Sequence, residues 1–166
     1  MIVEHLLTHG LLYGIIVIGY LFAIMISTSP RVWGYNDYPQ SIKDKVPPQT
    51  KSERRLAMLI ALPWFIFAFG FPIYSTLILK GKLSNDISVW IAFLNLLVLF
   101  LFATIGDLVI LDWLIVNKIT PKFVIIPGLE KQDYKDFSHH FKGHAKSLVV
   151  IIPILLVAAS LISFIG

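Results

Sequence analysis

The chain contains no cysteine among its 166 residues. This absence excludes structural disulfides, thiolate-bound metals and any redox relay that needs a cysteine pair. The sequence also lacks a glycine-rich phosphate loop and a Gly-x-Ser-x-Gly elbow. We therefore exclude nucleotide hydrolysis and the commonest form of serine hydrolase.

Charge is scarce too: 14% of the residues are charged and 57% are hydrophobic, with a mean hydropathy of +0.79. Four apolar tracts, at about 10–28, 56–79, 89–116 and 147–165, approach or exceed the roughly 18 to 20 residues that cross a hydrocarbon core. These tracts are apolar on all sides, whereas helices of a soluble bundle show one apolar stripe. The sequence predicts an all-α, polytopic membrane four-helix bundle, with residues 1–166 forming a single membrane domain.

The segment before the first tract has no lysine or arginine, which argues against a secretory signal and for a retained helix. It carries His5 and His9, which we interpret as a solvated helix end rather than a site. Gly10 and Gly14 follow at the four-residue spacing that lets two membrane helices approach closely. We expect them to form a helix-packing face, as we do for Ala159 and Ser163.

Positive charge is concentrated in two loops. Twelve of the 14 lysines and arginines lie in loops 29–55 and 117–146, whereas only Lys80 and Lys82 lie in the remaining loop. The positive-inside rule predicts that these two loops are cytoplasmic and that both termini, including Gly166, lie outside the cell membrane. A basic cytoplasmic rim favours anionic headgroups, so membrane lipids account for the charge and a nucleic-acid partner is not needed.

The first cytoplasmic loop combines turn formers with large aromatic residues, which predicts a folded segment. Its aromatic side chains are expected to anchor the loop in the headgroup region, and the alternative is a ligand contact. Thr50 and Glu53 form a Thr-x-x-Glu capping box that predicts the start of the second helix. The candidate contact residues of this loop are Trp33, Tyr35, Asn36, Asp37, Tyr38, Arg54 and Arg55.

The loop before the last span contains a helical pattern from Glu130 to about Gly143, with an apolar stripe that includes Phe137 and Phe141. We predict an interfacial amphipathic helix on the cytoplasmic leaflet. The apolar run at 122–126 is too short to cross the bilayer and is expected to lie along its inner surface.

Prolines interrupt two of the predicted spans: Pro63 and Pro72 lie in the second, and Pro153 lies in the fourth. Each removes a backbone hydrogen bond and frees a carbonyl about one turn earlier. In a membrane, neighbouring helices or water must satisfy these carbonyls.

The third tract contains Asn95, Asp107 and Asp112, which we predict to form an intramembrane polar site. An acid inside the membrane is costly and by default faces the bundle interior or water. Asp107, the deeper acid, is predicted to bind a proton, a cation or a polar substrate group, and the alternative is a structural hydrogen bond. Asn95 suits an interhelical hydrogen bond, and Asp112 is expected near Lys118 or Arg54. On an α-helix the two acids would lie about 140° apart and could not share a face.

Asp136, His140 and His144 repeat every four residues, which aligns them on one helix face where they could bind a divalent metal ion. The alternative is a set of solvated, pH-sensitive bases. A divalent metal is the only cofactor that the sequence suggests.

Three functions remain open. A small transport or permeation unit built around Asp107 is slightly favoured, and it would need a homo-oligomer or a partner membrane subunit to complete a pathway. A membrane-embedded enzyme would act on a lipid-like substrate at the cytoplasmic interface, using Asp107, Asp112 and the His140 face. An accessory or assembly subunit would have no site of its own.

Overall fold

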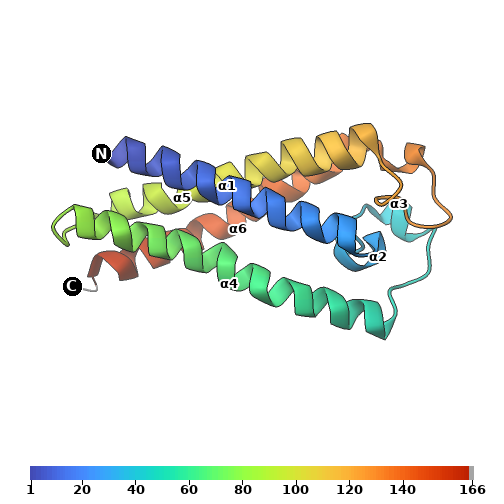
Figure 1. Cartoon of the computed structure of the whole chain (residues 1–166), viewed down its shortest axis with the longest axis horizontal. Coiled ribbons are helices and arrows are strands. Elements are labelled where there is room, and N and C mark those ends of the chain that lie inside the picture. Colours follow the sequence, from blue (N-terminus) through green and yellow to red (C-terminus); the bar gives the residue numbers. More distant parts are fainter. Residues whose placement is uncertain (165–166) are drawn as a thin grey trace.

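Four long helices build the protein, and the predicted all-α four-helix bundle is confirmed (Figure 1). The structure, a computed structural model, describes residues 1–164, so the predicted end of the last span at residue 165 lies outside the described residues. All four are long and apolar enough to cross a membrane, and the protein is an integral membrane protein. The long helices are α1 (Ile2–Ser27), α4 (Lys51–Lys82), α5 (Val89–Gly106), which continues into η1 (Asp107–Ile119), and α6 (Phe137–Phe164).

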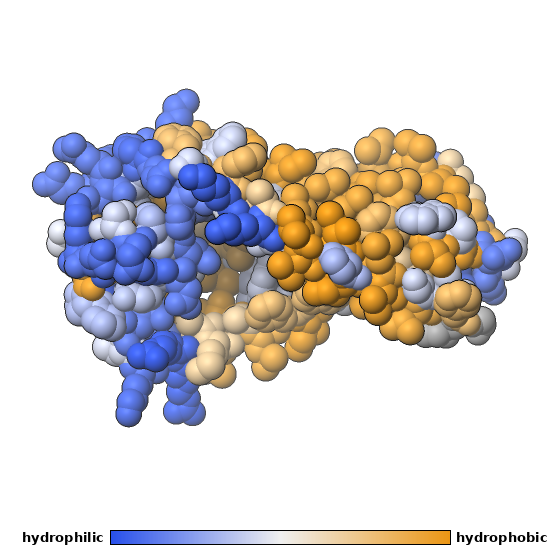
Figure 2. Space-filling model, turned by 180° about the vertical axis from the view of Figure 1, so that it is seen from behind, coloured by the Kyte–Doolittle hydropathy of each residue, from blue (hydrophilic) through white to orange (hydrophobic). Residues whose placement is uncertain are grey.

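The two ends of the bundle differ. The start of α1, the turn between α4 and α5 and the end of α6 lie together at one end, and the short helices α2 (Pro30–Trp33), α3 (Gln40–Lys43) and η2 (Lys131–Tyr134) lie at the other. The bundle surface is hydrophobic and the end with the short helices is hydrophilic (Figure 2). Helix α5 packs against the other three long helices, whereas α4 diverges from α1 toward the hydrophilic end (Figure 1).

Small residues let α1 and α5 pack closely, as the sequence predicts. Gly10 and Gly14 are buried, and a Cβ atom at Gly10 would lie 2.6 Å from the Phe102 ring. A Cβ atom at Gly14 would lie 3.3 Å from the Phe102 carbonyl oxygen. In the last helix Ala159 is fully buried in the core shared with α5.

Tyrosines of α1 satisfy carbonyls of α4 near its prolines. The Tyr13 hydroxyl donates to the Ala68 carbonyl at 2.9 Å, and this is the carbonyl that Pro72 leaves without its helical N–H donor. The Tyr20 hydroxyl donates to the Ile60 carbonyl at 3.0 Å, in the turn before Pro63. The expectation that neighbouring helices satisfy these groups is confirmed for Ala68.

The prediction that His5 belongs to a solvated helix end was wrong. His5 is 3% exposed, stacks on His9 with ring centroids 3.8 Å apart, and its Nε2 lies 3.1 Å from the Ser75 carbonyl. It is buried because α1 begins at Ile2 and packs its first turns against α4. Asn95 Nδ2 donates to Thr76 Oγ1 at 2.9 Å, which confirms the expected interhelical hydrogen bond.

The two long loops fold together over the hydrophilic end. We call residues 30–43, which contain α2 and α3, together with residues 121–134 the loop cap, whose core includes Tyr38, Ile42, Val124, Ile126 and Tyr134. Val124 and Ile126 are 0% and 1% exposed. The 122–126 run, expected to lie along the membrane surface, therefore places Val124 and Ile126 in the core of the cap, while Lys122 is exposed.

No separate amphipathic helix spans residues 130–143 in the described chain. The short helix η2 is followed by α6, which begins at Phe137 and runs unbroken into the last span. Asp136 sets this boundary, because its Oδ1 accepts hydrogen bonds from the backbone N–H groups of Ser138 and His139. The amphipathic turns that contain Phe141 are thus the beginning of the last membrane helix.

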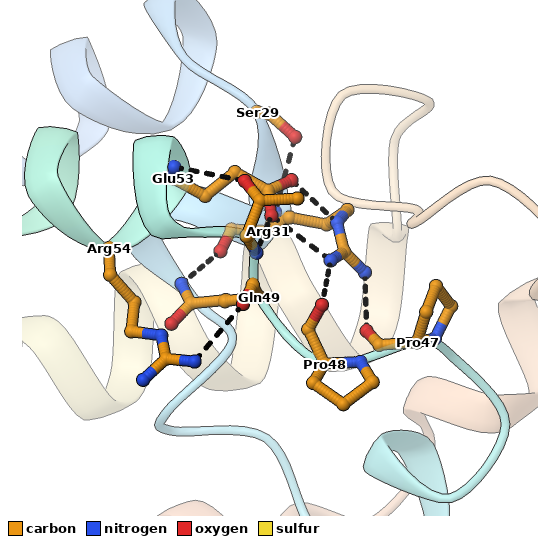
Figure 3. Close-up of polar contacts among 8 residues, drawn as sticks. Ser29, Arg31, Pro47, Pro48, Gln49, Glu53 and Arg54 are labelled. Atoms are coloured by element: carbon orange, nitrogen blue, oxygen red, sulfur yellow. Dashed lines mark hydrogen bonds and ion pairs between the residues drawn. The ribbon is translucent and has the colours of Figure 1, made fainter.

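Arg31 joins the first loop to the start of α4 (Figure 3). Its Nε donates to Glu53 Oε1 at 2.7 Å and its Nη2 donates to Oε2 at 3.1 Å. The same guanidinium donates to the carbonyls of Pro47 and Pro48, each at 2.9 Å. Glu53 also completes the predicted capping box with Thr50, which is confirmed at the start of α4.

Candidate active site and metal centre

Four side chains from two helices meet where η1 and α6 pack together next to the loop cap. Asp112 lies close to both histidines: its Oδ2 is 2.8 Å from His144 Nε2, and its Oδ1 is 3.2 Å from His140 Nδ1. Asp107 Oδ2 lies 3.9 Å from the same His144 nitrogen. We call Asp107, Asp112, His140 and His144 the acid–histidine cluster.

A change of helix type brings the two acids together. Residues Asp107–Ile119 form a π-helix, in which hydrogen bonds join residues five apart, and the Thr120 N–H bonds to the Ile115 carbonyl at 2.8 Å at its end. This repeat places Asp107 and Asp112 on nearly the same face. The prediction that they cannot share a face was therefore wrong, because it assumed α-helical geometry throughout.

The predicted metal-binding face of the last loop is formed only in part. His140 and His144 are one turn apart on α6 and both approach Asp112. Asp136 lies before the helix and caps it instead. Asp112 pairs with histidines, which corrects the expectation that it lies near Lys118 or Arg54.

A cavity of about 420 Å³ lies between the cluster and the first loop. His139 reaches across to this loop, with its Nε2 2.8 Å from the Asp37 carbonyl oxygen. Loss of solvation by the surrounding protein, and then repulsion by the nearby Asp112 carboxylate, raise the pKa of the Asp37 carboxyl above its usual value. Four of the predicted loop residues line the cavity: Trp33, Asn36, Asp37 and Tyr38.

The remaining predicted residues lie elsewhere. Tyr35 lies under Arg31, whose guanidinium carbon is 5.7 Å from the ring centroid. Arg54 donates to the Gln49 carbonyl at 3.4 Å, and Arg55 is exposed. Asn95 is twelve residues before Asp107, about 18 Å along the helix at 1.5 Å per residue. The predicted polar site therefore divides into a structural part at Asn95 and a cluster at Asp107 and Asp112.

Among the polar side chains of this cavity, the sequence interpretation missed His139 and Ser147. Ser147 follows His140 by seven residues and His144 by three, so it shares their helix face. From this spacing, Ser147 could have been predicted as a neighbour of the two histidines. His139 falls on a different part of the wheel, and only the fold of the first loop brings Asp37 to it.

The cluster has the dimensions of a metal site. One ligand atom each from Asp107, Asp112 and His144 lie within 4.8 Å of one another. Oxygen and nitrogen ligands about 2.1 Å from a tetrahedral metal lie roughly 3.4 Å apart. The observed 2.8 Å and 3.9 Å from His144 to the two acids bracket that value, so the spacing of these atoms is compatible with ligands of one ion.

No known family, curated protein or solved structure matches this chain. The acid–histidine cluster and the cavities beside it are therefore the main guides to function.

A second cavity, of about 540 Å³, extends along the membrane part of the bundle. We call it the apolar groove. Its walls come mainly from α4 and α6, and they include Trp64, Phe65, Ala68, Val150 and Ile151. The groove shares three residues with the cavity beside the first loop, which we call the polar cavity: Asp107, His144 and Ser147.

Proposed function

We propose that the protein is a membrane-embedded enzyme that uses a divalent transition-metal ion held by Asp107, Asp112 and His144. The observation that carries this proposal is the convergence of their ligand atoms within 4.8 Å beside a cavity of about 420 Å³. Three protein ligands with an open position next to a cavity are typical of catalytic rather than structural zinc sites.

The ligand types favour a transition metal. Imidazole nitrogen suits zinc, iron and similar ions, whereas magnesium and calcium prefer sites made only of oxygen ligands. The cluster combines two carboxylates with a histidine. The carboxylates would also offset the positive charge of the ion, which a site in the membrane requires. We therefore expect Zn²⁺ to bind more tightly than Mg²⁺.

Hydrolysis of an ester bond is the reaction that this arrangement supports best. The ion would lower the pKa of a bound water, and we assign the role of proton acceptor to His140, whose Nδ1 lies 3.2 Å from the ligand Asp112. The water oxygen would then form a bond to the electrophilic centre of the ester as the bond to the leaving oxygen breaks. The proton on His140 would pass to that leaving oxygen.

Transport, which the sequence slightly favours, is less well supported. A transported solute would need to pass from Asp107 toward the far end of the bundle. That direction contains the buried cluster of Tyr13, Val17, Leu99 and Ala103. A site at the inner end of a cavity suits catalysis better than transport of a solute through the bundle.

Metal binding by the purified protein tests the proposal. We expect about one Zn²⁺ per chain, measured by elemental analysis and by calorimetric titration in detergent. Asp112→Asn should weaken Zn²⁺ binding at least tenfold, because it removes a charged ligand that also holds both histidines. Ester hydrolysis, followed with a 4-nitrophenyl acyl ester, should fall with it.

Asp136→Asn is the matched control, since Asp136 is also next to the histidines in sequence but caps α6 outside the cluster. It should bind Zn²⁺ as the unmodified protein does. Helical content and elution volume would establish that each variant is folded, and His144→Ala provides a second ligand variant. Wild-type protein that binds no Zn²⁺, or ligand variants that bind it normally, would overturn the proposal.

A further inference from the structure

We infer that the apolar groove holds the acyl chain of a lipid substrate, and that this lipid enters the site sideways from the bilayer between α4 and α6. The inference rests on the proposed function, because it assigns the substrate class of the same metal site. It is carried by the way in which an apolar and a polar cavity meet at the acid–histidine cluster.

The two cavities match the two parts of a lipid. The wall of the polar cavity combines acidic, amide and histidine side chains with apolar ones such as Leu21 and Met25, whereas the groove is lined mostly by aromatic and aliphatic side chains. Asp107, His144 and Ser147 belong to both walls. A molecule with its chain in the groove and its polar head in the cavity would place the bond between them beside the metal ligands.

The groove opens to the bilayer rather than to water. Its wall residues Phe65 and Val150 are 57% and 65% exposed, and both lie within membrane-spanning helices. Helices α4 and α6 make little direct contact with each other. A recess is visible where the hydrophobic surface meets the hydrophilic end (Figure 2). Acyl chains are the apolar molecules that surround such an opening in a membrane.

The far wall of the groove is closed, which suits one flexible chain. Tyr13 and Ala103, 1% and 7% exposed, separate it from the opposite side of the bundle. The volume of about 540 Å³ lies within the roughly 300 to 1,000 Å³ of typical ligand pockets. Lys146 lies at the same end as the cluster, where its ammonium group can reach the headgroup region.

Photo-cross-linking in nanodiscs tests this inference. The probe is a phosphatidylcholine with a diazirine on one acyl chain, present at low mole fraction, and adducts are located by peptide mass spectrometry. We expect adducts to concentrate on the groove residues Phe65 and Val150, above the labelling of Val157, which at 62% is about as exposed but does not line the groove. Adding Zn²⁺ should raise groove labelling several-fold, because the ion would hold the polar end of the probe.

Val150→Trp and Val149→Trp form a matched pair. The two residues are neighbours and similarly exposed, at 65% and 72%, but only Val150 lines the groove. Val150→Trp should reduce groove labelling several-fold and Val149→Trp should leave it unchanged. The inference would be overturned if labelling followed exposure alone or if the two variants had equal effects. Cross-links to a second copy of the chain in place of lipid would also overturn it.

The outcome is separable from that of the proposed function. Asp112→Asn should abolish the effect of Zn²⁺ on labelling, whereas Asp136→Asn, which lies outside the cluster, should change neither the basal groove labelling nor the effect of Zn²⁺. Normal Zn²⁺ binding without groove labelling would reject the lipid chain and keep the metal site. Groove labelling that Zn²⁺ does not change in the unmodified protein would reject the lipid as a substrate of this site.

Discussion

Asp112 connects the two helices of the cluster, because one carboxylate lies within 3.2 Å of two histidines. Asp107 makes the longer contact, because its Oδ2 lies 3.9 Å from His144 Nε2. The carboxylates of Asp107 and Asp112 have oxygen atoms within 4.8 Å of each other. Two ionised carboxylates at such a distance repel each other unless a proton or a cation lies between them. The arrangement is therefore one that a bound cation would stabilise.

The choice of residues could be predicted from the sequence better than their grouping. Asp107 and the pair His140 and His144 were identified from their position in an apolar tract and from their spacing. Their union was only one of three alternatives that the sequence left open, because residues distant in sequence meet only through packing of η1 against α6. Asp136 was included in the histidine group for the same reason: spacing cannot tell a ligand from a helix cap.

At the same scale, Arg31 has a role in stability that can be tested. Arg31→Ala removes two hydrogen bonds to Glu53 and two to proline carbonyls. A charge-assisted bond of this kind contributes about 2 kcal/mol, which corresponds to roughly 4 to 8 °C in melting temperature for a chain of this size. Intrinsic tryptophan fluorescence during heating in detergent measures the change.

Two controls separate the contribution of the bidentate Arg31–Glu53 contact from that of the positive charge. Arg31→Lys keeps the charge but cannot form the bidentate contact with Glu53, so it should recover only part of the stability. Arg55→Ala removes an exposed charge in the first turns of α4 and should leave the melting temperature unchanged. Equal melting temperatures for the Arg31→Ala and Arg55→Ala variants would show that the Arg31 contacts add nothing.

At the scale of the helices, the π-helix was the feature that sequence reasoning could not supply. The residues of Asp107–Ile119 are more polar than the α-helical part of the same tract, but no residue type among them predicts a π-helical repeat. Its presence changes which side chains share a face, and with it the function that the two acids can serve. π-helical turns are rare and occur often at functional sites, which agrees with the position of the cluster.

The effect of the prolines on the helices could be predicted from the sequence in part. The sequence predicted a freed carbonyl before Pro72 but could not name its donor. We expect Tyr13→Phe to cost about 1 kcal/mol, because it leaves the Ala68 carbonyl without the Tyr13 hydroxyl. In a Pro72→Ala background the new backbone N–H can bond to Ala68, so the same Tyr13→Phe change should cost less.

A double-mutant cycle in melting temperature or denaturant stability measures this difference. Tyr20→Phe provides a comparison, since its hydroxyl bonds to the Ile60 carbonyl next to a different proline. Its effect should not depend on residue 72. Additive effects of Tyr13→Phe and Pro72→Ala would contradict the assignment of the Tyr13 hydroxyl to the freed carbonyl.

At the scale of the whole molecule, composition fixes the bundle and tertiary contact fixes the loop cap. Backbone groups in a hydrocarbon solvent must bond internally, so four long apolar tracts can form little other than helices. The loops have no such constraint. Val124 and Ile126 are as apolar as a membrane-surface segment, and only their contacts with Tyr38 and Tyr134 distinguish a buried core from a lipid contact.

The orientation of the molecule remains a prediction, and the absence of native cysteine makes it directly testable. Single cysteines at three exposed positions, Ser41→Cys, Asp86→Cys and Gln132→Cys, sample both long loops and the short hairpin. In intact cells a membrane-impermeant maleimide should label only the cysteine at 86, since the basic loops are retained in the cytoplasm. After permeabilisation all three should react.

Labelling of 41 and 132 but not 86 in intact cells would invert the topology and place the acid–histidine cluster at the outer surface. Labelling of only one of 41 and 132 would be incompatible with a four-span bundle, because the loop cap requires both loops on the same side.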